Sequence, residues 1–146
     1  MTELRGFVLA DAATVRAALY PNMELSQVRE MIGQWNAGFA GGRRFEMLAV
    51  VSDGCIVGAV SLYEQDAQSV SFGIEIAANY RCRGFATEAG RLALCHAEKK
   101  GYRKVLSQVR QDNAASIALH RKLGFVLTEK TVNRRGNPVF LYEKDL

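Results

Sequence analysis

Residues suited to hold a phosphorylated ligand stand where a strand pattern gives way to a helix pattern. Residues 71–76 alternate apolar with small or polar side chains, as a half-buried strand does, and the sequence RCRGFA at 81–86 then opens a helical pattern. The first turn of a helix has unpaired N–H groups and a partial positive charge, so it favours an anion. The two arginines add full charges there, and Gly84 lets the backbone approach a ligand closely. On its own, this pattern is also that of a basic, solvated helix start.

A second set of polar residues follows one predicted strand later, on the next helix. Asn113 is a good helix N-cap, and Gly124 is placed to end the same helix in the left-handed conformation. Asn113, Ser116 and His120 are three and four residues apart, so they share one stripe of that helix. A neighbouring apolar stripe, which we expect to face the sheet, consists of Ala115, Leu119 and Leu123.

Together the two motifs resemble those of the GNAT superfamily of acyl-CoA-dependent N-acyltransferases. Residues 81–86 match its pyrophosphate-binding pattern, Gln/Arg-x-x-Gly-x-Gly/Ala, and residues 113–125 are similar to its second motif, Asn-x-x-Ala/Ser-x-x-Leu-Tyr-x-x-x-Gly-Phe. The wording ATEA at 86–89 is similar to the branch that acetylates ribosomal-protein N-termini and polyamines. The match covers roughly residues 71–125, and it departs from the family at His120, where Tyr is usual.

The resemblance implies that acetyl-CoA donates an acetyl group to a primary amine by direct attack, without a metal. The acceptor is left open between a protein N-terminus, a polyamine and another small amine. The alternative is a non-catalytic acyl-CoA-binding regulatory domain on the same fold, which the His at position 120 keeps in consideration. A homodimer is compatible with the family. The cofactor-binding residues that the resemblance implies are Ile74, Ile76, Arg81, Cys82, Arg83, Gly84, Phe85, Ala86, Thr87, Asn113 and Ser116.

Glu75 is the candidate catalytic base that removes a proton from the acceptor ammonium. It is the only acidic residue on the predicted central strand, and it lies on the face opposite to Ile74 and Ile76. Gly73 leaves room beside it, and a carboxylate in a partly dry cleft has a raised pKa that suits a base. A chain of water molecules is the alternative base. The resemblance also implies that a backbone N–H near Ile76 meets the developing oxyanion.

His120 is the candidate general acid for the departing thiolate, because it takes the position of the family's Tyr and imidazolium is a competent acid near neutral pH. The other interpretations are a residue that packs against coenzyme A and a surface His. Tyr142, on the last predicted strand, competes for the role of acid. Asn113 and Ser116 are expected to orient the pantetheine arm or its phosphate.

The order of predicted elements is that of one α/β domain over residues 1–146. The resemblance implies a GNAT fold, with a mixed sheet of about seven strands that splays between the fourth and fifth, and about four helices. The Asp53-Gly54 pair is a strong hairpin signal. Strands are predicted at 4–10, 45–51, 55–63, 71–76, 102–109, 126–132 and 138–144, and helices at 11–19, 23–39, 85–100 and 113–123.

Composition narrows the class of protein and its partners. No apolar run approaches the ~18 residues of a membrane helix, and the start of the chain lacks a signal-peptide pattern, so a cytoplasmic protein is expected. Three cysteines without a C-x-x-C spacing predict neither zinc nor a disulfide scaffold. Residues 79–125 hold ten Lys and Arg against three Asp and Glu, which suits a polyanion such as coenzyme A or reflects a solvated basic surface. No nucleic-acid recognition motif accompanies this charge, so nucleic acid is not an expected partner.

Overall fold

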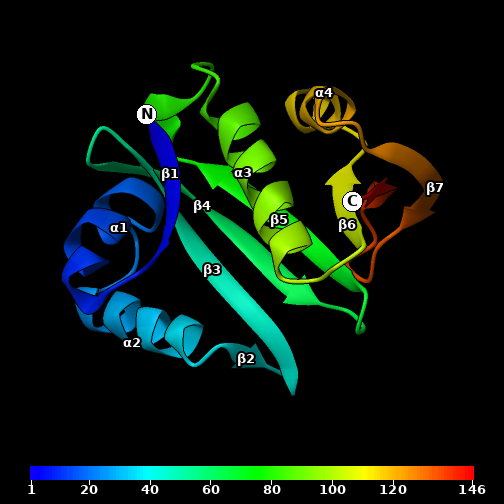
Figure 1. The fold of residues 1–146 in the computed structure, drawn as a ribbon. Helices are drawn as coiled ribbons and strands as arrows, with labels where there is room; N and C mark the ends of the chain where they lie inside the picture. The colour runs from blue at the N-terminus through cyan, green and yellow to red at the C-terminus, as the bar shows by residue number, and fades with distance from the viewer.

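A computed structural model describes all 146 residues. Four helices and eight strands form an α/β structure in which the strands join one mixed sheet (Figure 1). The helices are α1 (Ala12–Leu19), α2 (Leu25–Asn36), α3 (Phe85–Lys99) and α4 (Ala114–Lys122). The strands are β1 (Thr2–Gly6), β2 (Phe39–Ala40), β3 (Arg43–Ser52), β4 (Cys55–Glu64), β5 (Ser69–Ile76), β6 (Lys104–Arg110), β7 (Val126–Val132) and β8 (Pro138–Asp145).

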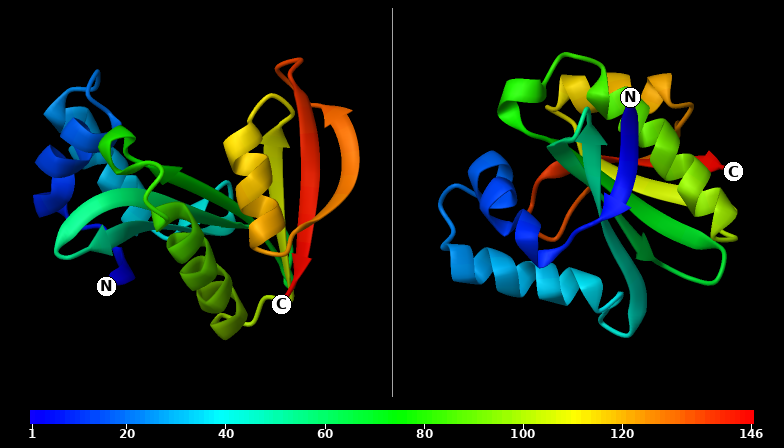
Figure 2. Two further views of the ribbon diagram at one scale, coloured as in Figure 1. Left: turned by 90° about the horizontal axis from the view of Figure 1, so that it is seen from above. Right: turned by 60° about the vertical axis from the view of Figure 1, so that its left-hand side comes forward.

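The sheet divides into two arms between β5 and β6, the fourth and fifth of the predicted strands, as the family resemblance implied. Its strands run in the order β1-β3-β4-β5-β6-β8-β7, with the short β2 paired beside β3. Every pair is antiparallel except β5 and β6, which are parallel and pair only from Ser69 to Ser71 and from Lys104 to Leu106. Beyond that point β5 stays on β4, while β6 turns away with β8 and β7, and the two arms form a V (Figure 2, left).

Two hydrophobic cores cover opposite faces of the first arm. One lies between the sheet and the helices α3 and α4, and it continues onto β6 and β8 through residues such as Val105 and Tyr142. The other lies between the sheet and the helices α1 and α2, around Phe7, Val28 and Ile32. The alternation on β5 follows from this arrangement, because Phe72 is buried against the first core and Glu75 lies on the opposite face.

Two predicted elements end earlier than the apolar pattern suggested. The first strand stops at Gly6, and Leu9–Asp11 forms a 3-10 turn. Asp11 does not cap α1 with its side chain; it accepts hydrogen bonds from the Arg5 guanidinium and the Val8 N–H instead. The second helix ends at Asn36, and Phe39 lies in β2 with 61% of its surface exposed.

The turn and the helix end that we predicted from glycine residues are confirmed, unlike the two ends that we predicted from apolar residues. Asp53 and Gly54 both have positive φ, 49° and 80°, as a tight hairpin turn of this type requires, and they join β3 to β4. Gly124 follows α4 with a φ of 89°, which confirms the predicted helix end. No helix of the structure has the length and apolar character needed to cross a membrane.

Candidate active site

A cleft of about 320 Å³ lies at the end of β5, beyond the point where β5 leaves β6, between the start of α3 and one face of α4. It is largely apolar, and its lining contains most of the predicted pyrophosphate-binding segment. The lining residues are Ile76, Tyr80, Arg81, Cys82, Gly84, Phe85, Ala86, Thr87, Ala115 and Leu119. Four of the predicted cofactor residues, Ile74, Arg83, Asn113 and Ser116, are not in this lining.

The loop before α3 has the backbone geometry expected of the predicted anion cradle. Gly84 is the N-cap of α3 in the left-handed conformation, with a φ of 83°, and Cys82 also has a positive φ of 61°. A Cβ at Gly84 would meet no atom within 4 Å, so the space beside the first turn is open. The N–H groups of that turn have no intrahelical partner, which leaves them to bind an anion. The geometry therefore fits the pyrophosphate of coenzyme A.

The two arginines of the loop differ in what they contact. Arg81 Nε donates a hydrogen bond of 3.1 Å to the Ile76 carbonyl, so part of its guanidinium fastens the loop to the end of β5. Arg83 lies over the Tyr80 ring, 5.8 Å from its centroid, and is exposed. Both keep their positive charge near the cradle, and Arg83 is the one free to turn toward a bound phosphate.

Helix α4 is capped as predicted, but the face that it turns toward the sheet is not the one we expected. The Asn113 side chain accepts a hydrogen bond from the Ser116 N–H at 3.1 Å, which confirms the N-cap. We expected Ala115, Leu119 and Leu123 to face the sheet, but only Leu123 is buried. Ala115 and Leu119 line the cleft instead, so this part of the apolar stripe forms a cofactor wall.

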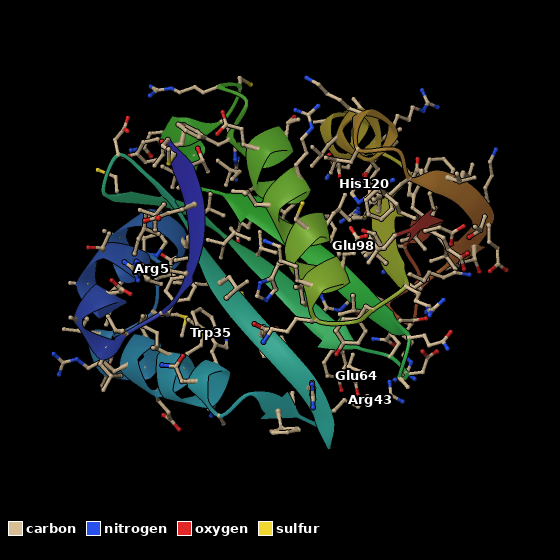
Figure 3. The ribbon with its side chains drawn as sticks, viewed as in Figure 1. Arg5, Trp35, Arg43, Glu64, Glu98 and His120 are labelled. Atoms are coloured by element: carbon tan, nitrogen blue, oxygen red, sulfur yellow. The ribbon has the colours of Figure 1, made fainter.

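His120 lies in the core between α4 and β6 rather than in the cleft (Figure 3). Its ring is 3% exposed and stacks on Tyr142, with centroids 5.2 Å apart. Nε2 is 2.7 Å from the Ser107 hydroxyl, and Nδ1 is 2.7 Å from the Ser116 carbonyl oxygen. Both ring nitrogens are occupied within the protein. This placement differs from our expectation of a general acid facing the thioester.

Burial lowers the pKa of His120, and the hydrogen bond to the Ser116 backbone opposes that shift only in part. We therefore expect the free energy of unfolding to decrease as the pH falls below about 6.5, the ordinary His value. In that range the unfolded chain binds a proton that the folded chain does not, so acid favours unfolding until the folded-state pKa is passed. Thermal unfolding between about pH 5 and 8 will show a shallower dependence for His120→Gln than for wild type. Equal slopes would contradict this prediction.

Glu75 is exposed on the face of β5 opposite to Ile76 and the cleft. Its charge is the second cause of a raised pKa at Tyr20, after burial of the phenol, so the two side chains are near each other. The Tyr20 ring lies 6.4 Å from Trp35, which in turn contacts Phe7. The side of the V toward α1 and α2 thus presents a carboxylate next to aromatic rings. Sequence reasoning missed Tyr20, because nothing in its spacing links it to β5.

A second groove, of about 500 Å³, lies on the other arm and reaches the point of the V. Ser71, on the same face of β5 as Glu75, forms one side of it. No Lys or Arg lines it, and its two carboxylates are Glu129 and Glu143, of which Glu143 pairs with Lys104 at 3.3 Å. The lining residues are Gln65, Ser71, Leu106, Ser107, Gln108, Thr128, Glu129, Leu141, Tyr142 and Glu143. The groove, called the acidic groove below, therefore suits a cationic ligand.

Comparison with known proteins gives both close sequence relatives and structural neighbours. The chain is 38% identical over 85 residues to the SPbeta prophage-derived uncharacterized N-acetyltransferase YokL of Bacillus subtilis (strain 168). That match covers 56% of this chain and 48% of YokL, so the chain spans about half the length of this curated relative.

Two solved structures share the fold at lower sequence identity. RimJ of Mycobacterium smegmatis, in complex with CoA-disulfide, has a TM-score of 0.85 at 20% identity, over 99% of this chain and 81% of that one. The dodecameric spermidine N-acetyltransferase of Vibrio cholerae has a TM-score of 0.81 at 19% identity, over 99% and 93% of the two chains.

The family assignment rests on the sequence match along most of the chain. The protein-family model described as the Acetyltransferase (GNAT) domain matches residues 2–126 of this sequence. This range includes both motifs and stops at the start of the final hairpin. The anion cradle and the splay between β5 and β6 lie inside the matched range. This chain belongs to the GNAT acetyltransferase family.

Proposed function

We propose that this chain is an N-acetyltransferase that acetylates the primary amine of a small cationic molecule. The observation that carries the proposal is that two openings lie along the diverging part of β5, the cleft at Ile76 and the second groove at Ser71. The cleft with the anion cradle approaches this part of β5 from the side of α3 and α4, and the acidic groove reaches it along the other face. A donor and an acceptor that enter from opposite faces come together where β5 and β6 separate.

The cleft provides separate supports for the parts of the donor. Acetyl-CoA, the co-substrate that the family uses, supplies the acetyl thioester. The N–H groups after Gly84 hold the pyrophosphate, and the apolar wall of Ala115 and Leu119 packs along the pantetheine arm. Beyond Ser71 the edge of β5 that faces β6 has no strand partner. The carbonyls of Phe72 and Ile76 lie within reach of Ser107 and Arg81, and the other backbone groups of this edge are left to bind the arm. In this proposal an N–H near Ile76, at the end of that edge, meets the developing oxyanion.

Glu75 takes the proton from the acceptor ammonium in this proposal. It lies on the face from which the acceptor enters, on the same strand as the proposed oxyanion donor. Because His120 is buried with both nitrogens occupied, we give it no proton-transfer role. No titratable residue of α4 lines the cleft, and Tyr142, the competing candidate acid, is buried against His120 outside it. Water is therefore the proposed proton source for the departing thiolate.

The acidic groove supports a cationic acceptor. Glu129 makes no ion pair within the chain, and it lies among neutral hydrogen-bonding side chains such as Gln65 and Gln108. Positive charge on a second amine of the acceptor would be favoured there, which suits a diamine or polyamine better than an uncharged peptide. The groove belongs partly to the hairpin of β7 and β8, beyond the range that the family model matches.

The first test is thiol release from acetyl-CoA in the presence of polyamines, amino acids, aminoglycosides and short peptides with free N-termini. We expect turnover with the amines that carry a second positive charge. Turnover with peptides alone would contradict the proposed acceptor class. Tight binding of coenzyme A without turnover across the panel would favour the alternative, a non-catalytic acyl-CoA-binding domain.

Replacing Glu75 with Gln will lower kcat by about 100-fold near neutral pH, because the ammonium then lacks its base. The KM for acetyl-CoA should stay within about twofold, since Glu75 lies on the face away from the cleft. The matched variant is Glu129→Gln, for which we expect a higher KM for the amine and an unchanged kcat. Steady-state kinetics separates the two effects. A wild-type kcat for Glu75→Gln would assign the base role to water.

A further inference from the structure

The hydroxyl of Ser107 stands where strand pairing between the two arms ends. The last paired residues of β5 and β6 are Ser71 and Leu106, so Phe72 and Ser107 are the first residues past the end of the ladder. Ser107 Oγ is 3.4 Å from the Phe72 carbonyl oxygen and 2.7 Å from His120 Nε2. One buried hydroxyl therefore lies within reach of β5 on one arm and of α4 on the other.

While His120 is neutral, the Ser107 hydroxyl cannot donate hydrogen bonds to both His120 Nε2 and the Phe72 carbonyl, because it has only one proton. Nδ1 is 2.7 Å from the Ser116 carbonyl oxygen, which only accepts, so Nδ1 carries the ring proton. Nε2 is then an acceptor, and Ser107 donates its single proton to it. If His120 is protonated, Nε2 becomes a donor, Ser107 accepts from it, and the hydroxyl proton turns to the Phe72 carbonyl.

The side chains packed around the His120 ring do not carry a charge that would decide the direction of the Ser107 hydroxyl. The aromatic rings of Phe72, Phe125 and Tyr142 surround the imidazole, with centroids 6.0, 4.9 and 5.2 Å away. Tyr142 of β8 is the only titratable side chain among them, and β6 contributes the neutral Ser107. No carboxylate or cation contacts the ring. The direction of the Ser107 hydroxyl is thus set by the protonation state of His120.

The same hydroxyl lies between the elements that form the two walls of the cofactor cleft. Ile76 extends from β5, and Ala115 and Leu119 extend from α4, the helix that carries His120. We propose that Ser107 and His120 are positioning residues that fix the spacing of these walls. When His120 is protonated, the Ser107 O–H turns to donate a hydrogen bond to the Phe72 carbonyl of β5, and this bond links the two arms. The proposal rests on the proposed use of the cleft for coenzyme A.

The test measures the dissociation constant of coenzyme A alone, by calorimetry, at about pH 8 and at an acidic pH at which nitrogen NMR shows His120 to be protonated. The variants are Ser107→Ala, which removes the hydroxyl, and Ser107→Thr, which keeps it. Titration of the ligand's own phosphate affects all three proteins equally, so the informative quantity is the affinity of wild type relative to Ser107→Ala. We expect this ratio to rise by about three- to tenfold at the acidic pH, the size of one hydrogen bond, and Ser107→Thr to match wild type. A ratio that is the same at both pH values would overturn the proposal.

Nitrogen NMR of His120 tests the hydrogen bonds without reference to the cofactor. We expect the Nδ1–H tautomer at about pH 8 in wild type. The Nε2–H tautomer would overturn the proposal even if Ser107→Ala proved too unstable to study. Failure of wild type to bind coenzyme A would instead overturn the proposed function of the cleft. The tautomer of His120 would still show whether Ser107 donates its hydrogen bond to Nε2.

Discussion

Replacing Gly84 with Asp will weaken coenzyme A binding by at least about 100-fold, because a like charge then stands against the pyrophosphate. A Cβ at Gly84 meets no atom within 4 Å, so the new side chain has room to extend into the region of the anion. It will also accept hydrogen bonds from the first-turn N–H groups of α3 that the phosphate needs. Binding measured by calorimetry should fall with little change in far-UV circular dichroism.

Gly54→Asp is the matched control for this change. Gly54 has a φ of 80° against 83° for Gly84, and a Cβ there also meets no atom within 4 Å. Both variants therefore carry the same backbone strain and the same added charge, but Gly54 lies in the turn between β3 and β4. We expect Gly54→Asp to bind coenzyme A as wild type does. An equal loss in both variants would show that strain, and not competition for the cradle, caused the effect.

Replacing Gly58 with Ala will destabilise the fold by about 3 kcal/mol, which is the upper part of the usual range for overpacking. Gly58 lies on β4 opposite Ile76, and a Cβ there would be 2.2 Å from the Glu75 carbonyl oxygen and 2.9 Å from Ile76 Cδ1. Because the first of these is a backbone atom, relief requires β4 and β5 to separate. For a chain of this length we expect a decrease in Tm of about 10 °C in thermal unfolding.

Gly6→Ala gives the comparison for a strand glycine without a close neighbour. Gly6 ends β1, and a Cβ there meets nothing within 4 Å. We expect its Tm to stay within about 3 °C of wild type, because Ala restricts the unfolded chain without crowding the folded one. If Gly58→Ala unfolds at the same temperature as Gly6→Ala, then β4 and β5 are less closely packed than the structure shows.

The elements and the cradle were readable from the sequence because they depend on local chemistry. The strand alternation at residues 71–76, the Asp53-Gly54 turn and the Asn113 cap each follow from contacts within a few residues, and each is confirmed. Gly84 marked the cradle for the same reason, since only the backbone of the loop decides its conformation. The roles of Glu75 and of the cradle in catalysis stay predictions.

The rotation of α4 was decided only by the tertiary structure. Ala115 and Leu119 form an apolar stripe beside the polar stripe of Ser116 and His120, and either stripe could have faced the sheet. The sheet side contains Ser107 and the aromatic ring of Tyr142, which give His120 a hydrogen bond and a stacking partner in the core. Ala115 and Leu119 are left to line the cleft.

The sequence by itself therefore determined most of the secondary elements and the conformation of the loop before α3, whose causes lie within one turn or one strand. The place where the arms separate, the position of His120 and the acidic groove involve residues that are far apart in the chain, such as Ser71 and Glu129. Contacts of this kind depend on how the elements pack against one another, and hydrophobic periodicity carries no information about the partner. The tertiary structure was needed to show that His120, a catalytic candidate on α4, is buried against Ser107 and Tyr142.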